Sequence, residues 1–282
     1  MIIDFHTHIF PKTIRENKEK YFKNEPAFKL LYESPNAKMA GADDIITDMN
    51  KAKVNISVVF GFPWKDMELA KMHNDYIIES VRKYKNRLYG FACFDMYNAN
   101  GCKEAQRCVE AGLIGVGELA CYESELDDNI IDKLKPTAEF CKDKDIVIML
   151  HTNEPIGHKY PGKIDITLKQ IYNLTKSFSE NKIVLAHWGG GILFYNLCKK
   201  ETKNIFKNLY FDTAASPFLY DNRIYKSAAD IIGSEKILFG TDYPLLKADR
   251  YFKEMKNAGL SEPAIKNILG KNAAELIKLN RN

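Results

Sequence analysis

The segment Ile2-Ile3-Asp4-Phe5-His6-Thr7-His8 is a mostly apolar run that ends in two histidines one residue apart. An apolar run without polar alternation is typical of a strand buried on both faces, as in a parallel sheet covered by helices. An open doubly wound sheet that binds a nucleotide would place a glycine-rich turn directly after this strand. Because Phe5-His6-Thr7-His8 stands there instead, the segment favours a closed barrel.

Further apolar runs rich in Val, Ile, Phe and Tyr follow this one along the chain. With the first run (2–6), they cover 56–60, 88–94, 114–119, 146–151, 183–187, 209–212 and 237–240. Helical periodicity fills the segments between, for example Leu69, Met72 and Ile77 after the second run, and Ser261 before Pro263 marks a capped helix start over 264–279. Repeated strand-then-helix units predict an α/β fold, a (β/α)8 TIM barrel, with residues 1–282 as a single domain.

One connection is unusually long. Residues 9–43 are rich in lysine, contain three prolines and show no strong periodic pattern. A long loop in a compact domain is usually functional or disordered, and this one leaves the carboxyl end of the first strand, the catalytic face of such barrels. We therefore predict that residues 9–43 form a capping loop over the site.

Composition and charge exclude several classes of protein. The chain has 41 basic and 37 acidic residues and a net charge of +4, which does not suggest a nucleic-acid or membrane-surface partner. Its six cysteines form no CxxC pair and are expected to be reduced and mostly buried. No signal peptide or membrane span is expected, so a cytoplasmic location is expected by default. A homodimer, the commonest closed oligomer, is a candidate assembly.

Metal-binding side chains gather at the ends of the predicted strands. They are His6, His8, Glu118, His151, His187 and Asp242. The carboxyl ends of all strands of a barrel meet at one mouth, and residues i and i+2 of a strand point to the same side, so the two histidines of the first strand can face one ion. Imidazole and carboxylate suit Zn²⁺ and related ions.

Each of these residues also has a structural explanation when taken alone. A single histidine can be a hydrogen-bonded core residue, Asp242 can cap the turn before Pro244, and Glu118 can be a buried structural acid. Taken together, these explanations fail, because four histidines and two acids would each have to reach the same face of the barrel for an unrelated structural reason. By contrast, His73 lies in a helical stripe and is expected to be structural, and His158 is expected to be solvated.

Several motifs resemble the amidohydrolase superfamily, and more closely its amidohydrolase family 2 branch. Asp4-Phe5-His6-Thr7-His8 is similar to the opening metal motif of the superfamily, and His151, His187 and Asp242 match its later ligands in order and approximate spacing. The branch is resembled by Asn74-Asp75, Val81-Arg82-Lys83-Tyr84, Gly90-Phe91, His187-Trp188-Gly189-Gly190-Gly191, Leu238-Phe239-Gly240-Thr241-Asp242-Tyr243-Pro244 and Asn272-Ala273-Ala274-Glu275-Leu276. The resemblance extends over essentially the whole chain.

The resemblance implies roles for the site residues. His6, His8 and Asp242 would bind a catalytic divalent metal, expected to be zinc, with His151 as a further ligand. His187 would bind the metal or polarise water and substrate, and Asp242 would also be the general base. Many members carry a bridging lysine where this chain has Glu118, and a glutamate there resembles branches with two metals.

Three functions follow from this reading. The first is a metal-dependent hydrolase of a small molecule, in which a metal lowers the pKa of water from 15.7 toward about 7 and Asp242 takes its proton. We predict that Glu118 binds or bridges metal, with His151 and His187 on a second ion; the alternative is a glutamate that orients the histidines from outside.

The alternative function is a metal-dependent decarboxylase of an aromatic or unsaturated carboxylic acid, as in other members of the family. That reaction calls for cationic groups near the substrate, and Lys159, Lys163 and Arg223 are candidates by position, although a solvated surface charge is the simpler explanation for each. A non-catalytic metal-binding barrel is the second alternative. The substrate itself cannot be read from the loops.

Overall fold

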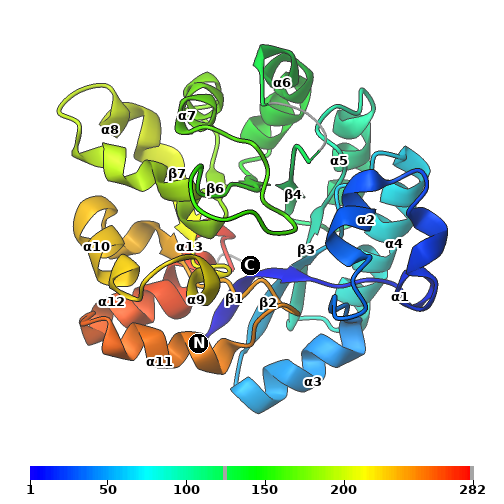
Figure 1. Ribbon diagram of the computed structural model, residues 1–282, viewed down its shortest axis with the longest axis horizontal. Helices are drawn as coiled ribbons and strands as arrows, with labels where there is room; N and C mark the ends of the chain where they lie inside the picture. Colours follow the sequence, from blue (N-terminus) through cyan, green and yellow to red (C-terminus); the bar gives the residue numbers. More distant parts are fainter. Residues whose placement is uncertain (123–125, 280–282) are drawn as a thin grey trace.

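The computed structural model describes residues 1–122 and 126–279, and its eight strands form one parallel sheet in chain order (Figure 1). The strands are β1 (Ile3–His8), β2 (Ile56–Phe60), β3 (Leu88–Ala92), β4 (Gly115–Leu119), β5 (Val147–Leu150), β6 (Ile183–Leu185), β7 (Leu209–Asp212) and β8 (Ile237–Leu238). The backbone N–H of Phe5 donates to Phe239 O (2.7 Å) and that of His8 to Tyr243 O (2.8 Å), which joins the last strand region to the first. The predicted (β/α)8 barrel is confirmed.

Helices cover the outside of the barrel. The α-helices are α1 (Lys12–Glu16), α2 (Pro26–Tyr32), α3 (Ala42–Ala52), α4 (Met67–Lys83), α5 (Gly101–Glu110), α6 (Asp128–Asp143), α7 (Leu168–Ser177), α8 (Thr202–Ile205), α9 (Ser216–Leu219), α10 (Arg223–Ile232), α11 (Ala248–Asn257), α12 (Glu262–Lys266) and α13 (Asn272–Leu276). The 3-10 segments are η1 (Lys18–Tyr21), η2 (His187–Leu197), η3 (Phe206–Asn208) and η4 (Ser234–Lys236), and η5 (Asn267–Lys271) is a π-helix. Segment η2 is interrupted by a left-handed stretch over Trp188, Gly189, Gly190 and Gly191.

The strands are buried on both faces, which explains their unbroken apolar runs. In β2, Ile56, Val58 and Phe60 belong to the cluster that fills the barrel, whereas Val59 belongs to the cluster between the barrel and the helices. Every residue of β2 is buried. Buried polar residues elsewhere in the strands are few, such as Asp4 and Ser57, and the histidines and acids of the candidate site lie at or just after the carboxyl ends of the strands, at the barrel mouth.

Local signals explain where several helices begin. The Asp66 carboxylate caps α4 by accepting from the backbone N–H groups of Glu68 and Leu69, and Ser261 caps α12 by accepting from Ala264 N. The helical spacing of Ile164, Leu168, Ile171 and Leu174 in the sequence begins one turn before helix α7, which starts at Leu168. Ile164 is buried in the loop that precedes Thr167, so its place in this spacing reflects burial of a loop rather than an additional helical turn.

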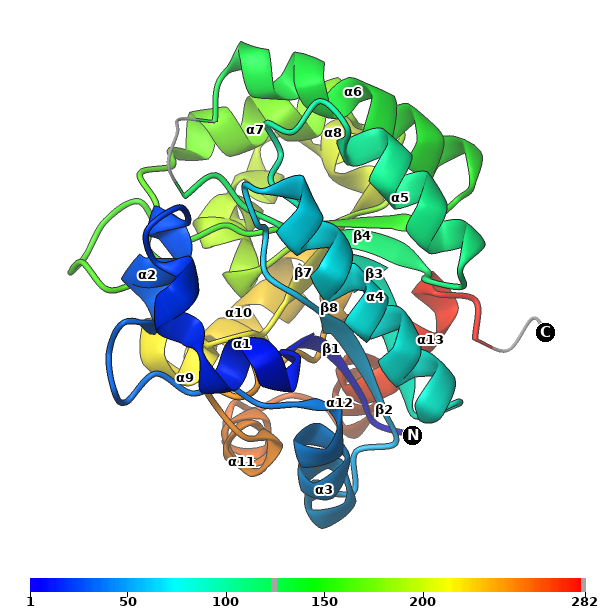
Figure 2. The same cartoon turned by 90° about the vertical axis from the view of Figure 1, so that its right-hand side faces the viewer.

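Residues 9–43 are more regular than the sequence predicted. They contain α1, η1 and α2, and Figure 2 shows α1 and α2 at the end of the barrel away from the two termini. The segment is held by aromatic packing: the Phe28 ring lies 4.5 Å from Trp64 and 5.4 Å from Phe62, measured between centroids. Aromatic packing, which follows no sequence period, orders a stretch that periodicity could not assign.

Two further expectations concern cysteines and membrane spans. All six cysteines lie in the described part of the chain and are free, and four of them are buried. Within residues 1–122 and 126–279, no helix combines the length and apolarity that crossing a bilayer would require.

Candidate metal centre

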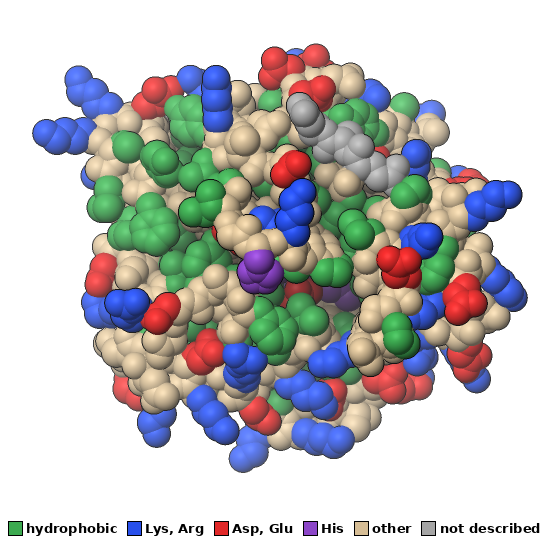
Figure 3. Space-filling view, viewed as in Figure 1, with side chains coloured by type: hydrophobic (Ala, Val, Ile, Leu, Met, Phe, Trp, Pro, Cys, Tyr) green, Lys and Arg blue, Asp and Glu red, His purple; other side chains and the backbone are tan. Residues whose placement is uncertain are grey.

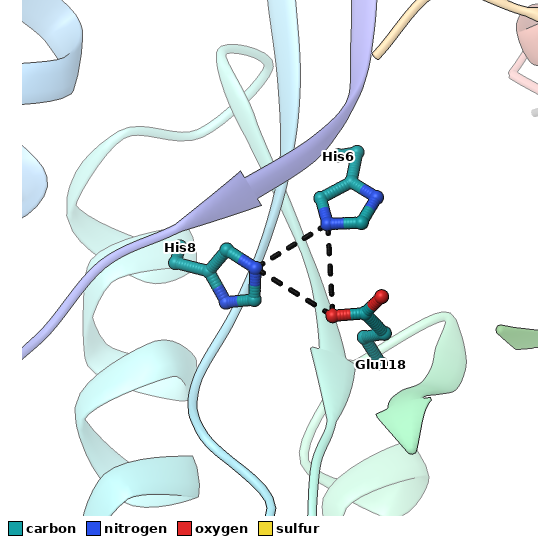
Figure 4. Close-up of side chains that lie close together, drawn as sticks. All are labelled: His6, His8 and Glu118. Carbon is teal, nitrogen blue, oxygen red and sulfur yellow. Dashed lines mark hydrogen bonds and ion pairs between the residues drawn. The ribbon is translucent and has the colours of Figure 1, made fainter. Parts of the chain in front are cut away.

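The six predicted site residues meet at the carboxyl ends of the strands. His6 and His8 belong to β1 and Glu118 to β4, and Figure 4 shows their side chains pointing toward one another. The His6 and His8 Nε2 atoms are 3.3 Å apart, and the Glu118 Oε2 atom lies 3.6 Å and 3.7 Å from them. His151 directly follows β5, and its Nδ1 lies 3.0 Å from Glu118 Oε1. His187 Nε2 lies 3.6 Å from the same oxygen.

Asp242 completes the group from the segment after β8. Its Oδ1 atom lies 3.4 Å from His8 Nε2 and 3.6 Å from His6 Nε2. The residue has a left-handed backbone (φ 61°), which directs its carboxylate back across the mouth, and its backbone N–H donates to His6 O (3.0 Å). Asp4 fixes the neighbouring turn, because its carboxylate accepts from the backbone N–H and the hydroxyl of Thr241.

Each of the four imidazoles is oriented by an acceptor outside the cluster. His6 Nδ1 donates to Asp212 Oδ2 (2.8 Å), and His8 Nδ1 to Gly61 O (3.1 Å). His187 Nδ1 donates to Ala214 O (3.0 Å), and His151 Nε2 donates to Gly162 O (3.0 Å). A carbonyl or carboxylate oxygen can only accept, so the proton of each neutral ring lies on this outer nitrogen.

The other ring nitrogens therefore present lone pairs to the space where carboxylate oxygens also converge. Acceptors that face acceptors need a cation between them, and the separations of 3.3–3.7 Å among His6, His8 and Glu118 are about those of ligands that share one ion with roughly 2.1 Å bonds. The residues present thus fit a divalent metal.

Glu118 lies between two pairs of histidines. Its Oε2 faces His6 and His8, and its Oε1 faces His151 and His187. Either pair, with the nearer oxygen of Glu118, forms a set of three candidate ligands. Asp242 lies beside His6 and His8, so this side of Glu118 has the richer set of donors.

Without a metal, protons balance the carboxylates. Burial alone would lower the pKa of His6, but Glu118 and Asp212 outweigh it and raise the pKa to about 10. His187 has a pKa raised to about 9, because its hydrogen bond with Glu118 and the charge of Asp242 outweigh burial. Burial would raise the pKa of Asp242, but the hydrogen bond from His8 and the charge of His6 lower it to about 2.

Metal uptake at pH 7 is expected to release protons. The metal-free protein holds protons on His6 and His187 at this pH, because pH 7 lies below pKa values of about 10 and 9. A metal ion must displace them, so we expect about one to two protons per ion and an affinity that falls as the pH is lowered. An indicator dye in weakly buffered solution measures the release on addition of MnCl2. Equal affinity at pH 6 and pH 8 without proton release would contradict this assignment.

Asp212 is a functional candidate that the sequence reasoning missed. It is fully buried at the end of β7, and besides His6 it accepts from the backbone N–H groups of His187 and Ala214. The Asp212 carboxylate thus orients the candidate ligand His6 and also the loop that carries the candidate ligand His187. An acid as the last residue of an apolar run, on the same face as the histidines, was a signal available in the sequence.

Asp212→Asn is expected to weaken metal binding about 10- to 100-fold, the usual effect of losing the partner that orients a histidine ligand. The asparagine side chain has one oxygen that can accept, so the His6 ring N–H and the backbone N–H groups of His187 and Ala214 compete for it. Chelator competition measures the affinity, and Asp221→Asn on the exposed surface is the matched control. Unchanged affinity in Asp212→Asn would show that the contact does not orient His6.

The remaining candidates lie outside the cluster. His73 is buried, donates through Nε2 to Ile9 O (2.7 Å) and accepts from Trp64 Nε1, so its predicted structural role is confirmed. His158 and Lys159 are exposed, and Arg223 is exposed and bonded to Asp221. Lys163 is not a solvated charge: its side chain is 10% exposed and bonds Glu154 and two loop carbonyls.

A barrel with histidines and carboxylates gathered at its mouth defines a class of metal-dependent enzymes. The chain belongs to the amidohydrolase family, whose model matches residues 3–279. Its fold is that of an enzyme of this family, and the predicted resemblance is confirmed.

Named relatives refine the comparison. The chain is 24% identical to 2-amino-3-carboxymuconate-6-semialdehyde decarboxylase of Dictyostelium discoideum, over 99% of this chain and 92% of that protein. Its fold is similar to 5-carboxyvanillate decarboxylase of Sphingomonas paucimobilis (TM-score 0.79, 14% identity, 98% of each chain). It is also similar to a dihydroxybenzoic acid decarboxylase of Polaromonas with bound manganese (TM-score 0.69, 19% identity, 100% of this chain and 98% of that one). Manganese in that neighbour means that the comparisons do not specifically favour zinc.

Proposed function

We propose that the protein is a divalent-metal-dependent decarboxylase of a small aromatic or unsaturated carboxylic acid. The observation that carries this proposal is the match, over 99% of this chain, to a curated decarboxylase. Solved neighbours that act on aromatic acids support the same reaction. The decarboxylase, the alternative from the sequence, therefore takes the place of the hydrolase as the leading function.

His6, His8, Glu118 and Asp242 would hold the metal, with His151 and His187 on the other side of Glu118, and the metal would supply positive charge for the oxygens of a bound substrate. Asp242 would serve as the proton carrier: it accepts a proton from a substrate hydroxyl and delivers it to the carbon that loses carbon dioxide. The carbon–carbon bond breaks, its electron pair stays on that carbon, and the proton replaces the carboxylate there. The site needs no further reactant.

Residues 9–43 would cap this site as part of one barrel domain over residues 1–282. Tyr32 of α2 lies 6.1 Å from Phe62, between ring centroids, and burial together with the charge of Asp242 raises the pKa of its hydroxyl. A cap that excludes water favours decarboxylation, because a carboxylate loses solvation there and carbon dioxide carries no charge.

Hydrolysis is the second candidate, and the position of Glu118 is the observation that favours it. A carboxylate between two histidine pairs is suited to two ions, which would help an attacking water. Asp242 would then accept the proton of that water. Whether the protein binds zinc or manganese can be tested by carrying out the same experiments with each ion.

The reaction can be tested directly on the purified, manganese-loaded protein. We expect carbon dioxide release from at least one member of a panel of hydroxybenzoic and unsaturated carboxylic acids, detected by a coupled assay. The same protein is offered a panel of carboxylic esters, amides and phosphate esters. Cleavage of an ester, amide or phosphate ester without carbon dioxide release from any acid would overturn the decarboxylase proposal in favour of hydrolysis.

A titration with Glu118→Gln separates the two candidates by metal count. We expect one tight equivalent in the wild type, on the side where Asp242 adds a fourth donor, and one weaker equivalent in the variant, because an amide is a poorer ligand than a carboxylate. Calorimetry of the metal-free protein measures both, with the exposed Glu68→Gln as control. Two equivalents in the wild type and one in Glu118→Gln would instead support a bridging glutamate and hydrolysis.

A further inference from the structure

We propose that Asn74 and Cys93 are positioning residues of the metal centre, which fix the backbone of Glu118 from outside the barrel mouth. Asn74-Asp75 is one of the motifs that resemble the family, yet neither residue belongs to the candidate ligands. Asn74 reaches Glu118 in two steps, through the backbone and then the thiol of Cys93. The inference rests on the proposed metal centre and not on which reaction the metal serves.

A buried ion pair anchors Asn74 between two helices. Helices α4 and α5 lie side by side outside β3 (Figure 1). Glu104 of α5 is 2% exposed, and both of its carboxylate oxygens accept from Arg107 (2.8 Å each). The Asn74 side-chain amide donates to the same carboxylate (2.8 Å), and Asp75 accepts from Arg107 (2.7 Å). A buried carboxylate needs such partners, so the pair fixes the direction of the Asn74 amide.

The other end of the Asn74 amide holds the segment that leads to the site. Its oxygen accepts from the backbone N–H of Cys93 (2.9 Å), the residue that directly follows β3. The Cys93 thiol in turn donates to the backbone O of Glu118 (3.0 Å). Asn74 and Cys93 are 0% and 1% exposed, so water does not compete for these bonds. An unbroken series of hydrogen bonds therefore links the ion pair on α5 with the backbone of a candidate ligand.

Glu118 needs this outside support because the sheet does not fix its backbone. The register between β3 and β4 ends at Val116, and the register between β4 and β5 shifts between Val116 and Leu119. Glu118 thus lies in an irregular part of its strand, where the regular ladder is interrupted and the direction of a side chain changes. The Cys93 thiol donates to the carbonyl at this point, and the bond holds the peptide from which the Glu118 carboxylate extends.

Asn74 can act on the metal centre only through these bonds. Figure 3 shows the mouth face, where acidic and histidine side chains are visible at the bottom of a central hollow. Asn74 has no exposed surface and is bonded to α5, so it does not line this hollow. A metal ion in the hollow would meet the Glu118 carboxylate, and any effect of Asn74 on that ion has to pass through Cys93.

Manganese affinity tests the inference, measured by calorimetry on the metal-free proteins. We expect Asn74→Ala and Cys93→Ala each to weaken manganese binding by roughly 3- to 10-fold, the effect of one lost hydrogen bond. Cys93→Ser keeps a donor for the Glu118 carbonyl and should bind nearly like the wild type. Two matched controls should also bind like the wild type. Asn181→Ala removes a buried amide bond at the amino end of β6, opposite the mouth, and Cys141→Ala removes a buried free thiol.

A double variant tests the order of the two steps. If Asn74 acts through Cys93, Asn74→Ala/Cys93→Ala should bind manganese about as well as the weaker of the two single variants, because both changes break the same series of bonds. The electron paramagnetic resonance spectrum of bound manganese is a second readout, which loss of stability alone would not change. We expect it to differ from the wild type in Asn74→Ala and Cys93→Ala and to match the wild type in Asn181→Ala.

The outcomes separate this inference from the proposed reaction. Wild-type affinity in Asn74→Ala or Cys93→Ala, an equal loss in Asn181→Ala, no recovery in Cys93→Ser, or losses that add in the double variant would overturn the positioning role. A wild type that binds no manganese would overturn it together with the metal centre. Carbon dioxide release is followed in the same samples: weakened manganese binding without release from any acid keeps the positioning role and removes the decarboxylase, and release with unchanged affinities does the reverse.

Discussion

Manganese-loaded Asp242→Asn is expected to turn over its substrate about 10²–10⁴ times more slowly than the wild type, the usual cost of losing a group that carries a proton. Asparagine keeps the shape of the side chain and one oxygen near His8 and His6, but it cannot accept and deliver a proton. The backbone should be preserved, because asparagine tolerates the left-handed conformation of this position (φ 61°). Steady-state kinetics measure the change in kcat and in kcat/KM.

Metal content decides how this result is interpreted. We expect the variant to retain part of its metal, since one ligand oxygen remains, so turnover is normalised to bound ion. Asp221→Asn, exposed and paired with Arg223, should keep full activity. Near-normal turnover of metal-loaded Asp242→Asn would mean that the residue only shapes the turn before Pro244. The test applies equally to hydrolysis and to decarboxylation, because both reactions assign a proton transfer to this carboxylate.

The barrel was predictable because its strands are buried on both faces. The runs at 56–60 and 209–212 coincide with β2 and β7, since successive residues are buried in two different apolar clusters and the strands are therefore mostly apolar, with Ser57 as the polar exception inside β2. Strand ends were less accurate. The run at 183–187 extends past β6, which ends at Leu185, because apolar burial continues into the turn that carries His187.

The site residues were predictable for a related reason. A polar side chain at the end of an apolar strand has few structural uses, so His6, Glu118 and His151 could be assigned to the mouth without knowledge of the loops. The partners that orient them were not predictable. Asp212 was read as part of a strand, and the carbonyls of Gly61 and Gly162 come from loops whose path depends on tertiary contacts.

The reaction could not be inferred from the candidate metal ligands alone. Glu118 suggested hydrolysis, but the same arrangement of candidate ligands is suited to one ion or to two. Rings such as Tyr32 of α2 and Tyr122 after β4 come near the site from separate segments of the chain. Their approach depends on how residues 9–43 fold onto the barrel. The burial of Lys163 could not be predicted from the sequence either, because its ion pair with Glu154 depends on the geometry of the loop.

His6→Ala is expected to lose most of the bound metal. His6 lies at the centre of the cluster: its Nε2 is within 3.6 Å of His8, Glu118 and Asp242, and its other nitrogen is held by the buried Asp212. Removing it deletes one coordinate bond and leaves the Asp212 carboxylate without its histidine partner, so the loss should exceed that of His8→Ala, whose outer partner is a backbone carbonyl. Elemental analysis of the purified proteins gives the metal content.

Thermal unfolding gives a second readout that does not depend on how the proteins were purified. A ligand that binds only the folded state at 100 times its Kd adds about 2.7 kcal/mol of stability, so manganese should raise the melting temperature of the wild type. His6→Ala should gain little at the same manganese concentration, and the exposed His158→Ala should respond like the wild type. If His6→Ala instead holds as much metal as the wild type and shows the same thermal shift, then His6 is no ligand. The centre would then have to be built on Glu118, His151 and His187 alone.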